Sequence, residues 1–183
     1  SIGRRLPFVH ARVVAASARE CPAGKIGALL FARENVIPGY YSQPARLPES
    51  LVEIEGRAWF RTGDLAEIDE EGYFYVRGRK KDMIIVGGEN VFASEVEAVL
   101  LELDGVRETA VKGVPATGVR ASLGELIQAY VVPAPPEGPS ETDIRRHCHK
   151  RLPSCKIPHR IRFLPELPRN AAGKVVKADL PEE

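Results

Sequence analysis

Hydrophobic residues over positions 1–76 fall in short runs of strand length. Val9–Ala15 is rich in β-branched residues, and Ile26–Ala32 is an apolar run bounded by turn-forming residues. Leu65–Ile68 and Tyr73–Val76 flank three acidic residues and a glycine, which predicts a hairpin. Prolines and glycines between positions 38 and 48 predict an irregular stretch. We therefore expect this part of the chain to be built of β-strands.

The pattern changes after the polar stretch Gly78–Asp82. Met83–Val86 reads as a short strand that runs directly into two glycines. Ser94, with Glu97 three residues later, matches a capping box and predicts the start of a helix. Apolar residues then recur at helical spacing at Val96, Val99, Leu100 and Leu103, and we expect them to face a core.

The remaining elements alternate between strands and helices. Ser140 and Asp143 predict another helix start, with the helix running to about Leu152. The other expected elements are strands at Glu108–Val114, Leu126–Val132 and Arg160–Leu164, a proline-rich linker over 133–139, and a short helix from Lys177. The predicted fold class is α+β: a β-rich segment over 1–78, a hinge over 79–82, and a small mixed α/β domain over 83–183.

Composition excludes several classes of protein. The 183 residues are 44% hydrophobic and 28% charged, as in globular proteins, and the net charge of +1 gives no electrostatic basis for binding nucleic acid. No apolar run approaches the length of a membrane span. Three cysteines do not make a disulfide framework, so we expect a reducing, cytoplasmic location. The chain begins Ser-Ile-Gly and its one methionine is Met83, so we expect it to be a piece of a longer protein.

Three segments carry candidate chemistry. In Trp59–Leu65, Asp64 follows a glycine at an expected strand start and could accept hydrogen bonds from vicinal hydroxyls such as those of a ribose. On local grounds alone, the interpretation of Asp64 as a residue that caps a turn is favoured over ribose binding. In the second segment, Arg79 offers a bidentate fork for phosphate or ribose oxygens, and Gly88 would let a ligand pass close to the backbone. That segment also fits a solvated charged turn followed by a hairpin glycine pair.

The third segment is Pro168–Lys174. Its terminal lysine follows a glycine in a loop of small residues and is suited to a phosphate or carboxylate oxygen. The loop lacks the longer frame of a P-loop, and an exposed loop lysine without a function is the alternative.

The order and spacing of these three motifs resemble the C-terminal part of the adenylate-forming acyl-CoA synthetases. This superfamily also includes luciferase-type enzymes and the adenylation domains of peptide synthetases. Trp59–Leu65 resembles its Tyr/Phe-Arg-Thr-Gly-Asp-Leu motif, Gly78–Glu97 the motif around its hinge, and Pro168–Lys174 its Pro-x-x-x-x-Gly-Lys motif. The resemblance implies the end of a large N-terminal domain followed by a mobile C-terminal domain. The family's phosphate loop and acyl pocket lie upstream, so we expect the 183 residues alone to be inactive.

The resemblance also implies two half-reactions. A carboxylic acid reacts with ATP, carrying Mg²⁺, to give an acyl-adenylate, and the thiol of coenzyme A then displaces AMP. By matched position, Asp64 and Arg79 would bind the nucleotide, and Lys174 would be the catalytic lysine of the first step. Lys81 falls at the hinge about which the small domain turns between the steps. Gly88 would line the passage for the pantetheine arm.

Two alternatives to a CoA ligase remain. Gly87–Asn90 is closer to acyl- and aryl-CoA ligases than to peptide-synthetase adenylation domains, which favours CoA over a carrier-protein thiol. A non-catalytic module that docks to a partner is the alternative from another class. A metal site is disfavoured, because His147, Cys148 and His149 are adjacent on a predicted helix and point in different directions.

Overall fold

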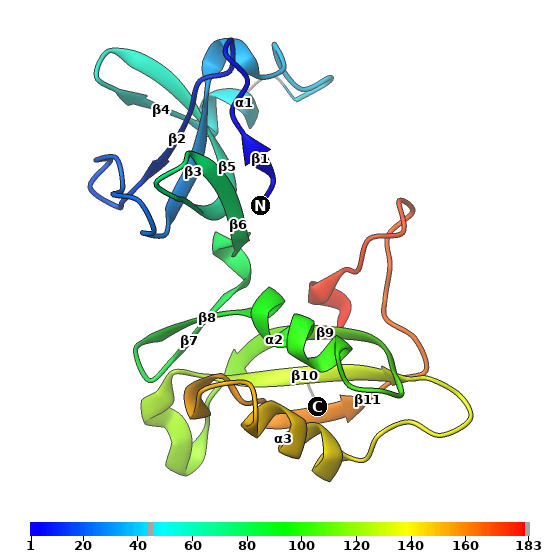
Figure 1. The fold of residues 1–183 in the computed structure, drawn as a ribbon. Helices are drawn as coiled ribbons and strands as arrows, with labels where there is room; N and C mark the ends of the chain where they lie inside the picture. The colour runs from blue at the N-terminus through cyan, green and yellow to red at the C-terminus, as the bar shows by residue number, and fades with distance from the viewer. Residues whose placement is uncertain (44–45, 182–183) are drawn as a thin grey trace. The chain divides into compact units, whose positions relative to one another are not determined.

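A computed structural model describes residues 1–43 and 46–181 of the chain (Figure 1). The chain divides into two compact units, Ser1–Lys81 and the part that begins at Asp82. The division falls inside a 3-10 turn, Lys80–Asp82. Within the described residues, no helix has the length and apolar character needed to cross a membrane.

The first unit is an antiparallel sheet in the order β1-β6-β5-β3-β2, with β4 paired to β5. Its elements are β1 (Gly3–Arg4), β2 (Ala11–Val14), β3 (Gly27–Ala32), α1 (Arg46–Glu49), β4 (Leu51–Ile54), β5 (Arg57–Ile68) and β6 (Tyr73–Arg79). The predicted β-structure is confirmed, and so is the hairpin after Ile68. Asp69 Oδ1 accepts the backbone N–H groups of Glu71 and Tyr73, which closes that turn.

Strand β5 organises the first unit because it pairs with β3, β4 and β6. The β4–β5 hairpin was not predicted. Its two-residue turn is Glu55-Gly56, and both residues have positive φ, as a tight hairpin turn requires. Trp59 is 2% exposed and packs with Leu30 in a hydrophobic cluster of this unit.

The second unit combines a three-stranded sheet, a hairpin and two helices. The sheet has the order β11-β10-β9, in which β9 runs antiparallel and β11 parallel to β10. Its elements are β7 (Met83–Val86), β8 (Glu89–Phe92), α2 (Ala93–Leu101), β9 (Val106–Pro115), β10 (Glu125–Pro133), α3 (Glu141–His149) and β11 (Arg160–Phe163). The strands predicted here are confirmed with small differences at their ends. The predicted terminal helix is a single 3-10 turn, Lys177–Asp179.

Strand β10 is buried on both faces. Ile127, Ala129 and Val131 pack with apolar residues of α2 and α3, among them Val96, Leu100 and Ile144. Tyr130 and Val132 point to the other face, where Leu167 and Leu180 of the C-terminal segment cover them. The two helices therefore cover one face of the sheet, and the C-terminal segment that carries Lys174 covers the other.

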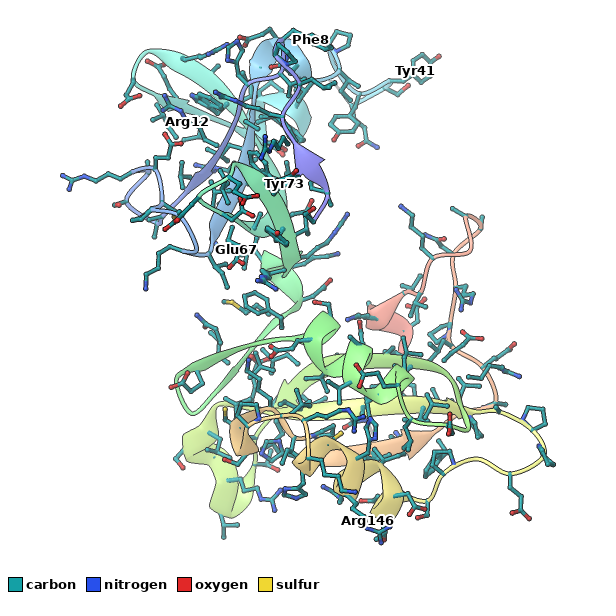
Figure 2. All side chains as sticks on the ribbon, in the orientation of Figure 1. Phe8, Arg12, Tyr41, Glu67, Tyr73 and Arg146 are labelled. Atoms are coloured by element: carbon teal, nitrogen blue, oxygen red, sulfur yellow. The ribbon has the colours of Figure 1, made fainter. Side chains whose placement is uncertain are left out.

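The two helix starts turned out differently. At α3, Ser140 and Asp143 form the predicted capping box, and Asp143 also forms an ion pair with Arg146. Arg146 lies on the exposed side of the helix (Figure 2). At α2 the predicted capping box is wrong, because the helix begins at Ala93 and places Ser94 within its first turn. Glu97 instead accepts hydrogen bonds from Val111 and Lys177, which are distant in the sequence.

Candidate active site

Asp64 lies inside β5, which corrects the expectation of a strand start or a turn. Three features turn its side chain outward: the β3–β5 register shifts beside it, Gly63 has φ +81°, and Thr62 bridges the bulge. The Thr62 hydroxyl donates to the carbonyl of Leu29 at 2.9 Å and accepts the N–H of Asp64 at 2.9 Å. The residues Arg-Thr-Gly-Asp are thus a β-bulge that presents a carboxylate.

Arg79 lies opposite Asp64 on the neighbouring strand, β6. The two residues are partners in the β5–β6 register, and Arg79 Nε lies 3.4 Å from Asp64 Oδ1. The Asp64 side chain is 28% exposed and that of Arg79 58% exposed, so both can reach a ligand. An acceptor beside a fixed cation suits sugar hydroxyls next to a phosphate.

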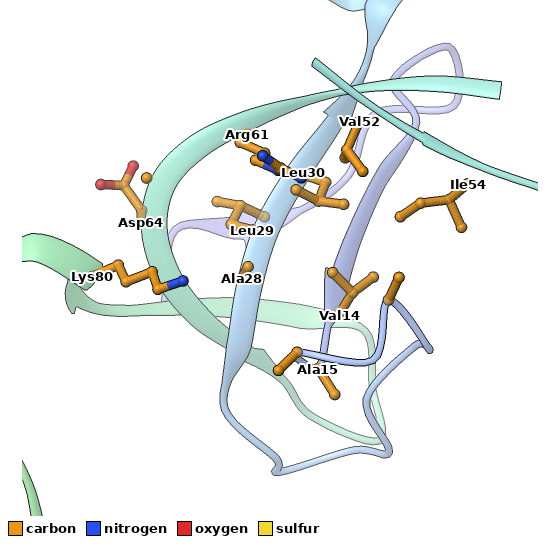
Figure 3. A pocket seen from close by; sticks show the side chains of 13 residues that line it. Val14, Ala15, Ala28, Leu29, Leu30, Val52, Ile54, Arg61, Asp64 and Lys80 are labelled. Carbon is orange, nitrogen blue, oxygen red and sulfur yellow. The ribbon is translucent and has the colours of Figure 1, made fainter. Parts of the chain in front are cut away.

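A cavity of about 350 Å³ opens beside Asp64 (Figure 3). Asp64 and Lys80 lie at one end, while Val14, Val52 and Ile54 line the other. Apolar walls with a few charged side chains are the usual make-up of a small-molecule site. Lys80 was not singled out in the sequence analysis, although it directly follows Arg79.

Gly87 and Gly88 form the two-residue turn between β7 and β8, with φ of +58° and +88°. The hairpin glycine pair considered from the sequence is therefore present. A Cβ on Gly88 would meet no atom within 4 Å, so its backbone faces open space. Gly87 is more confined, because its N–H donates to the carbonyl of Leu123 at 2.8 Å.

Lys174 ends a tight loop in the second unit. Asn170 Oδ1 accepts the N–H groups of Ala172 and Lys174, each at 3.0 Å, and Gly173 has φ +77°. Hydrogen bonds to the Asn170 side chain hold the loop backbone, while the Lys174 side chain is exposed to solvent. Within residues 1–43 and 46–181, Lys174 makes no ion pair with a carboxylate. Its amine is thus available to a ligand.

The histidines and cysteines near α3 have structural environments. His147 Nε2 lies 2.9 Å from the carbonyl of Val99, and Cys148 is fully buried in the core, where burial raises the pKa of its thiol. In the part of the chain that the structure describes, no three His, Cys, Asp or Glu side chains group to hold a metal ion.

Residues 95–174 match the model of the AMP-binding enzyme C-terminal domain. The chain belongs to the adenylate-forming superfamily and carries its C-terminal domain. The family resemblance seen in the sequence is therefore confirmed, and the α+β fold with it. The chain spans about a third of the length of the curated relatives it matches.

Two relatives represent the matches by sequence. One is a propanoyl:CoA ligase of Rhodococcus jostii whose acyl group carries a methyl-dioxo-octahydroindenyl ring; it is 39% identical over 181 residues, covering 99% of this chain and 32% of the relative. The other is the fatty acid–acyl-carrier-protein ligase ScoC of Streptomyces coeruleorubidus, 36% identical over 178 residues, covering 97% of this chain and 33% of the relative.

Solved structures agree with this assignment. The o-succinylbenzoate CoA synthetase MenE of Bacillus subtilis, in complex with an acyl-adenylate intermediate, gives a TM-score of 0.84 at 31% identity, over 97% of this chain and 34% of that one. ATP-bound MatB of Rhodopseudomonas palustris gives 0.84 at 36% identity, over 97% and 34%. Apo MatB gives 0.67 over the same shares, so these two MatB structures differ within the matched region.

Proposed function

We propose that the chain is the C-terminal region of an ATP-dependent acyl- or aryl-CoA ligase. The observation that carries the proposal is the accessible pair of Asp64 and Arg79 in one unit together with the exposed amine of Lys174 in the other, which makes no ion pair with a carboxylate of the described residues, 1–43 and 46–181. CoA ligases among the relatives, and ATP- and adenylate-bound solved neighbours, support the same chemistry.

In the first half-reaction, a carboxylate oxygen of the acid attacks the α-phosphorus of ATP, and the bond from that phosphorus to pyrophosphate breaks. Asp64 would accept hydrogen bonds from the ribose hydroxyls, and Arg79 would hold the nucleotide beside it. Lys174 would lie between the carboxylate and the α-phosphate and stabilise the negative charge that gathers there. This role needs a permanent positive charge in a fixed place rather than a proton transfer.

In the second half-reaction, the thiol sulfur of CoA attacks the acyl carbon. The bond from that carbon to AMP breaks, and the thiol proton passes to solvent. We propose that the small mixed α/β domain, residues 83–183, turns about the hinge 79–82 at Lys81 between the two steps, relative to the β-rich segment 1–78. The difference between the ATP-bound and apo structures of MatB supports such a change of arrangement. Gly88, whose backbone faces open space, would line the path of the pantetheine arm.

The test uses the full-length protein and a panel of acids: acetate, octanoate, palmitate and benzoate. ATP–pyrophosphate exchange that depends on one of these acids, followed by thioester formation with CoA, is the expected result. Absence of exchange with every acid would refute the proposal. Inactivity of the isolated 183 residues stays a prediction, as does a cytoplasmic location, which the three free cysteines favour.

A carrier-protein thiol is the second candidate acceptor, because ScoC, one of the relatives, is a fatty acid–acyl-carrier-protein ligase. Replacing CoA by a phosphopantetheinylated acyl carrier protein in the same assay separates the two. Faster thioester formation on the carrier protein would favour the second candidate.

A further inference from the structure

Hydrogen bonds, an ion pair and a buried side chain attach the segment that follows Lys174 to the rest of the second unit. Lys177 Nζ donates to Glu97 Oε1 at 2.7 Å and to the carbonyl of Val111 at 2.9 Å. Leu180 is 2% exposed, and its carbonyl accepts from Lys112 Nζ at 2.9 Å. Three residues of extended chain span at most about 10 Å, so the Lys177 anchor restricts where the backbone of Lys174 can lie.

Glu97 joins this segment to the helix and to the sheet. Its Oε1 accepts the N–H of Val111 at 2.8 Å as well as the Lys177 ammonium. Val111 is fully buried on β9, the edge strand of the sheet. Glu97 and Lys177 therefore satisfy both polar groups of one edge residue that would otherwise be buried without partners. Their side chains are only 21% and 26% exposed, which strengthens the ion pair.

The other end of the loop is attached to the same strand. Arg169 forms an ion pair with Glu108 of β9 and donates to the carbonyl of Gly173 at 2.6 Å. Arg169 and Val175 also form an isolated β-bridge across the base of the loop. The Lys174 loop is thus held at both ends on β9, through Glu108 on one side and Val111 on the other.

We propose that Glu97 and Lys177 are positioning residues for Lys174. The ion pair sets the place from which the Lys174 amine reaches its ligand, without itself touching that ligand. The inference rests on the proposed function of Lys174 in the adenylation step. An electrostatic contact of this kind accelerates a reaction only when it is already in place as charge develops. Loss of the Glu97–Lys177 ion pair should therefore slow the adenylation step.

The first test compares the two half-reactions in the full-length enzyme carrying Lys177→Met. Methionine keeps the apolar stem and removes both hydrogen bonds. Misplacement of a reacting group by about 1 Å can cost roughly 100-fold, so we expect ATP–pyrophosphate exchange to fall about 10- to 100-fold in kcat. Thioester formation from preformed acyl-adenylate and CoA should stay near the wild-type rate, and Lys177→Arg should restore most of the exchange.

The chain offers a matched control from the same helix. Glu95 of α2 pairs with Lys156, whose Nζ lies 2.7 Å from both carboxylate oxygens and whose side chain is 24% exposed. This pair anchors the turn at 154–156 instead of the Lys174 loop. Lys156→Met should therefore leave the ratio of the two half-reactions unchanged. Equal loss of both half-reactions in Lys177→Met, or the same ratio change in both variants, would overturn the inference.

Hydrogen exchange gives a readout that does not depend on activity. The amides of Gly173, Lys174 and Val176 donate to Asn170 and Pro168 within the loop, and we expect them to exchange faster in Lys177→Met but not in Lys156→Met. Wild-type protection of these amides in Lys177→Met would overturn the anchoring. If the wild-type enzyme adenylates no acid while the amides respond as expected, the proposed function fails and the anchoring stands, though the positioning role for Lys174 falls with that function.

Discussion

Asp64 and Arg79 lie directly opposite each other on β5 and β6, with Asp64 Oδ1 and Arg79 Nε 3.4 Å apart. Because the two residues are neighbours, the two sequence motifs that carry them contribute to a single site. The carboxylate of Asp64 pairs with Arg79 on the neighbouring strand and remains partly exposed, so it can also bind a ligand.

Asp64→Ala should raise the KM for ATP in the full-length enzyme. Loss of hydrogen bonds to a charged group costs about 1.5–3 kcal/mol, so kcat/KM should fall roughly 10- to 100-fold. The variant should also discriminate less than the wild type against 2′-deoxy-ATP, because the proposed partner of the ribose hydroxyls is gone. Steady-state kinetics with both nucleotides checks this.

The matched control is Glu67→Ala, which removes an ion pair between the same two strands, the one with Arg77. It should leave the KM for ATP near the wild-type value. If both variants changed that KM alike, Asp64 would have only a structural role in the sheet.

Lys174→Ala should reduce ATP–pyrophosphate exchange by about 100- to 1,000-fold, the usual cost of one transition-state electrostatic contact. Thiolysis of preformed acyl-adenylate should survive, because the role proposed for the lysine is confined to the first step. The control is Lys150→Ala, which removes an exposed amine in the same unit and should alter neither rate. Equal loss of both half-reactions in Lys174→Ala would contradict the assignment.

Lys81→Pro should spare adenylation and block thioester formation. Proline holds φ near −65° and restricts the residue before it, so the joint at the Lys80–Asp82 turn would lose its freedom to rotate. Lys81→Ala removes the same side chain but leaves φ free, and should make thioester normally. Single-turnover measurement of each step tests the pair; normal thioester formation by the proline variant would exclude a hinge at Lys81.

The stability of the second unit should decrease as the pH falls below about 6.5, because of His159. Burial, with the positive charges of Arg120 and Arg145, lowers the pKa of His159 from its ordinary 6.5. Its Nδ1 accepts the N–H of Ile127 at 3.2 Å, which requires an unprotonated nitrogen. The unfolded chain therefore binds the proton more readily, so the stability is complete above the unfolded pKa and is lost as pH falls toward the folded one.

Urea unfolding of the full-length protein at pH 7.5 and 5.5 measures this effect. Replacing His159 by Gln, whose side-chain carbonyl can accept the same bond, should reduce the dependence on pH. Replacing the exposed His149 in the same way should leave it intact. A wild-type midpoint that does not fall at pH 5.5 would show that His159 has no such role.

Local signals in the sequence were sufficient for the elements that depend on near neighbours. The capping box at Ser140 and Asp143 acts within one helical turn, and the turn at Asp69 binds its own following residues, so both were predicted correctly. The family motifs likewise identified Asp64, Arg79 and Lys174 as residues to examine. Hydrophobic runs located most strands because alternate side chains must face a core.

Only the tertiary structure decided how distant residues pair. Glu97 looked like a capping residue, but its carboxylate binds Lys177, 80 positions away, and the edge of β9. The β-bulge that turns Asp64 toward Arg79 depends on the register of three strands, which no local pattern encodes. The amino-acid sequence by itself determined which groups could do the chemistry and where helices and strands could form. The packing of remote segments decided which of those groups meet and which are left open to a ligand, because hydrogen bonds and ion pairs depend on proximity in space rather than along the chain.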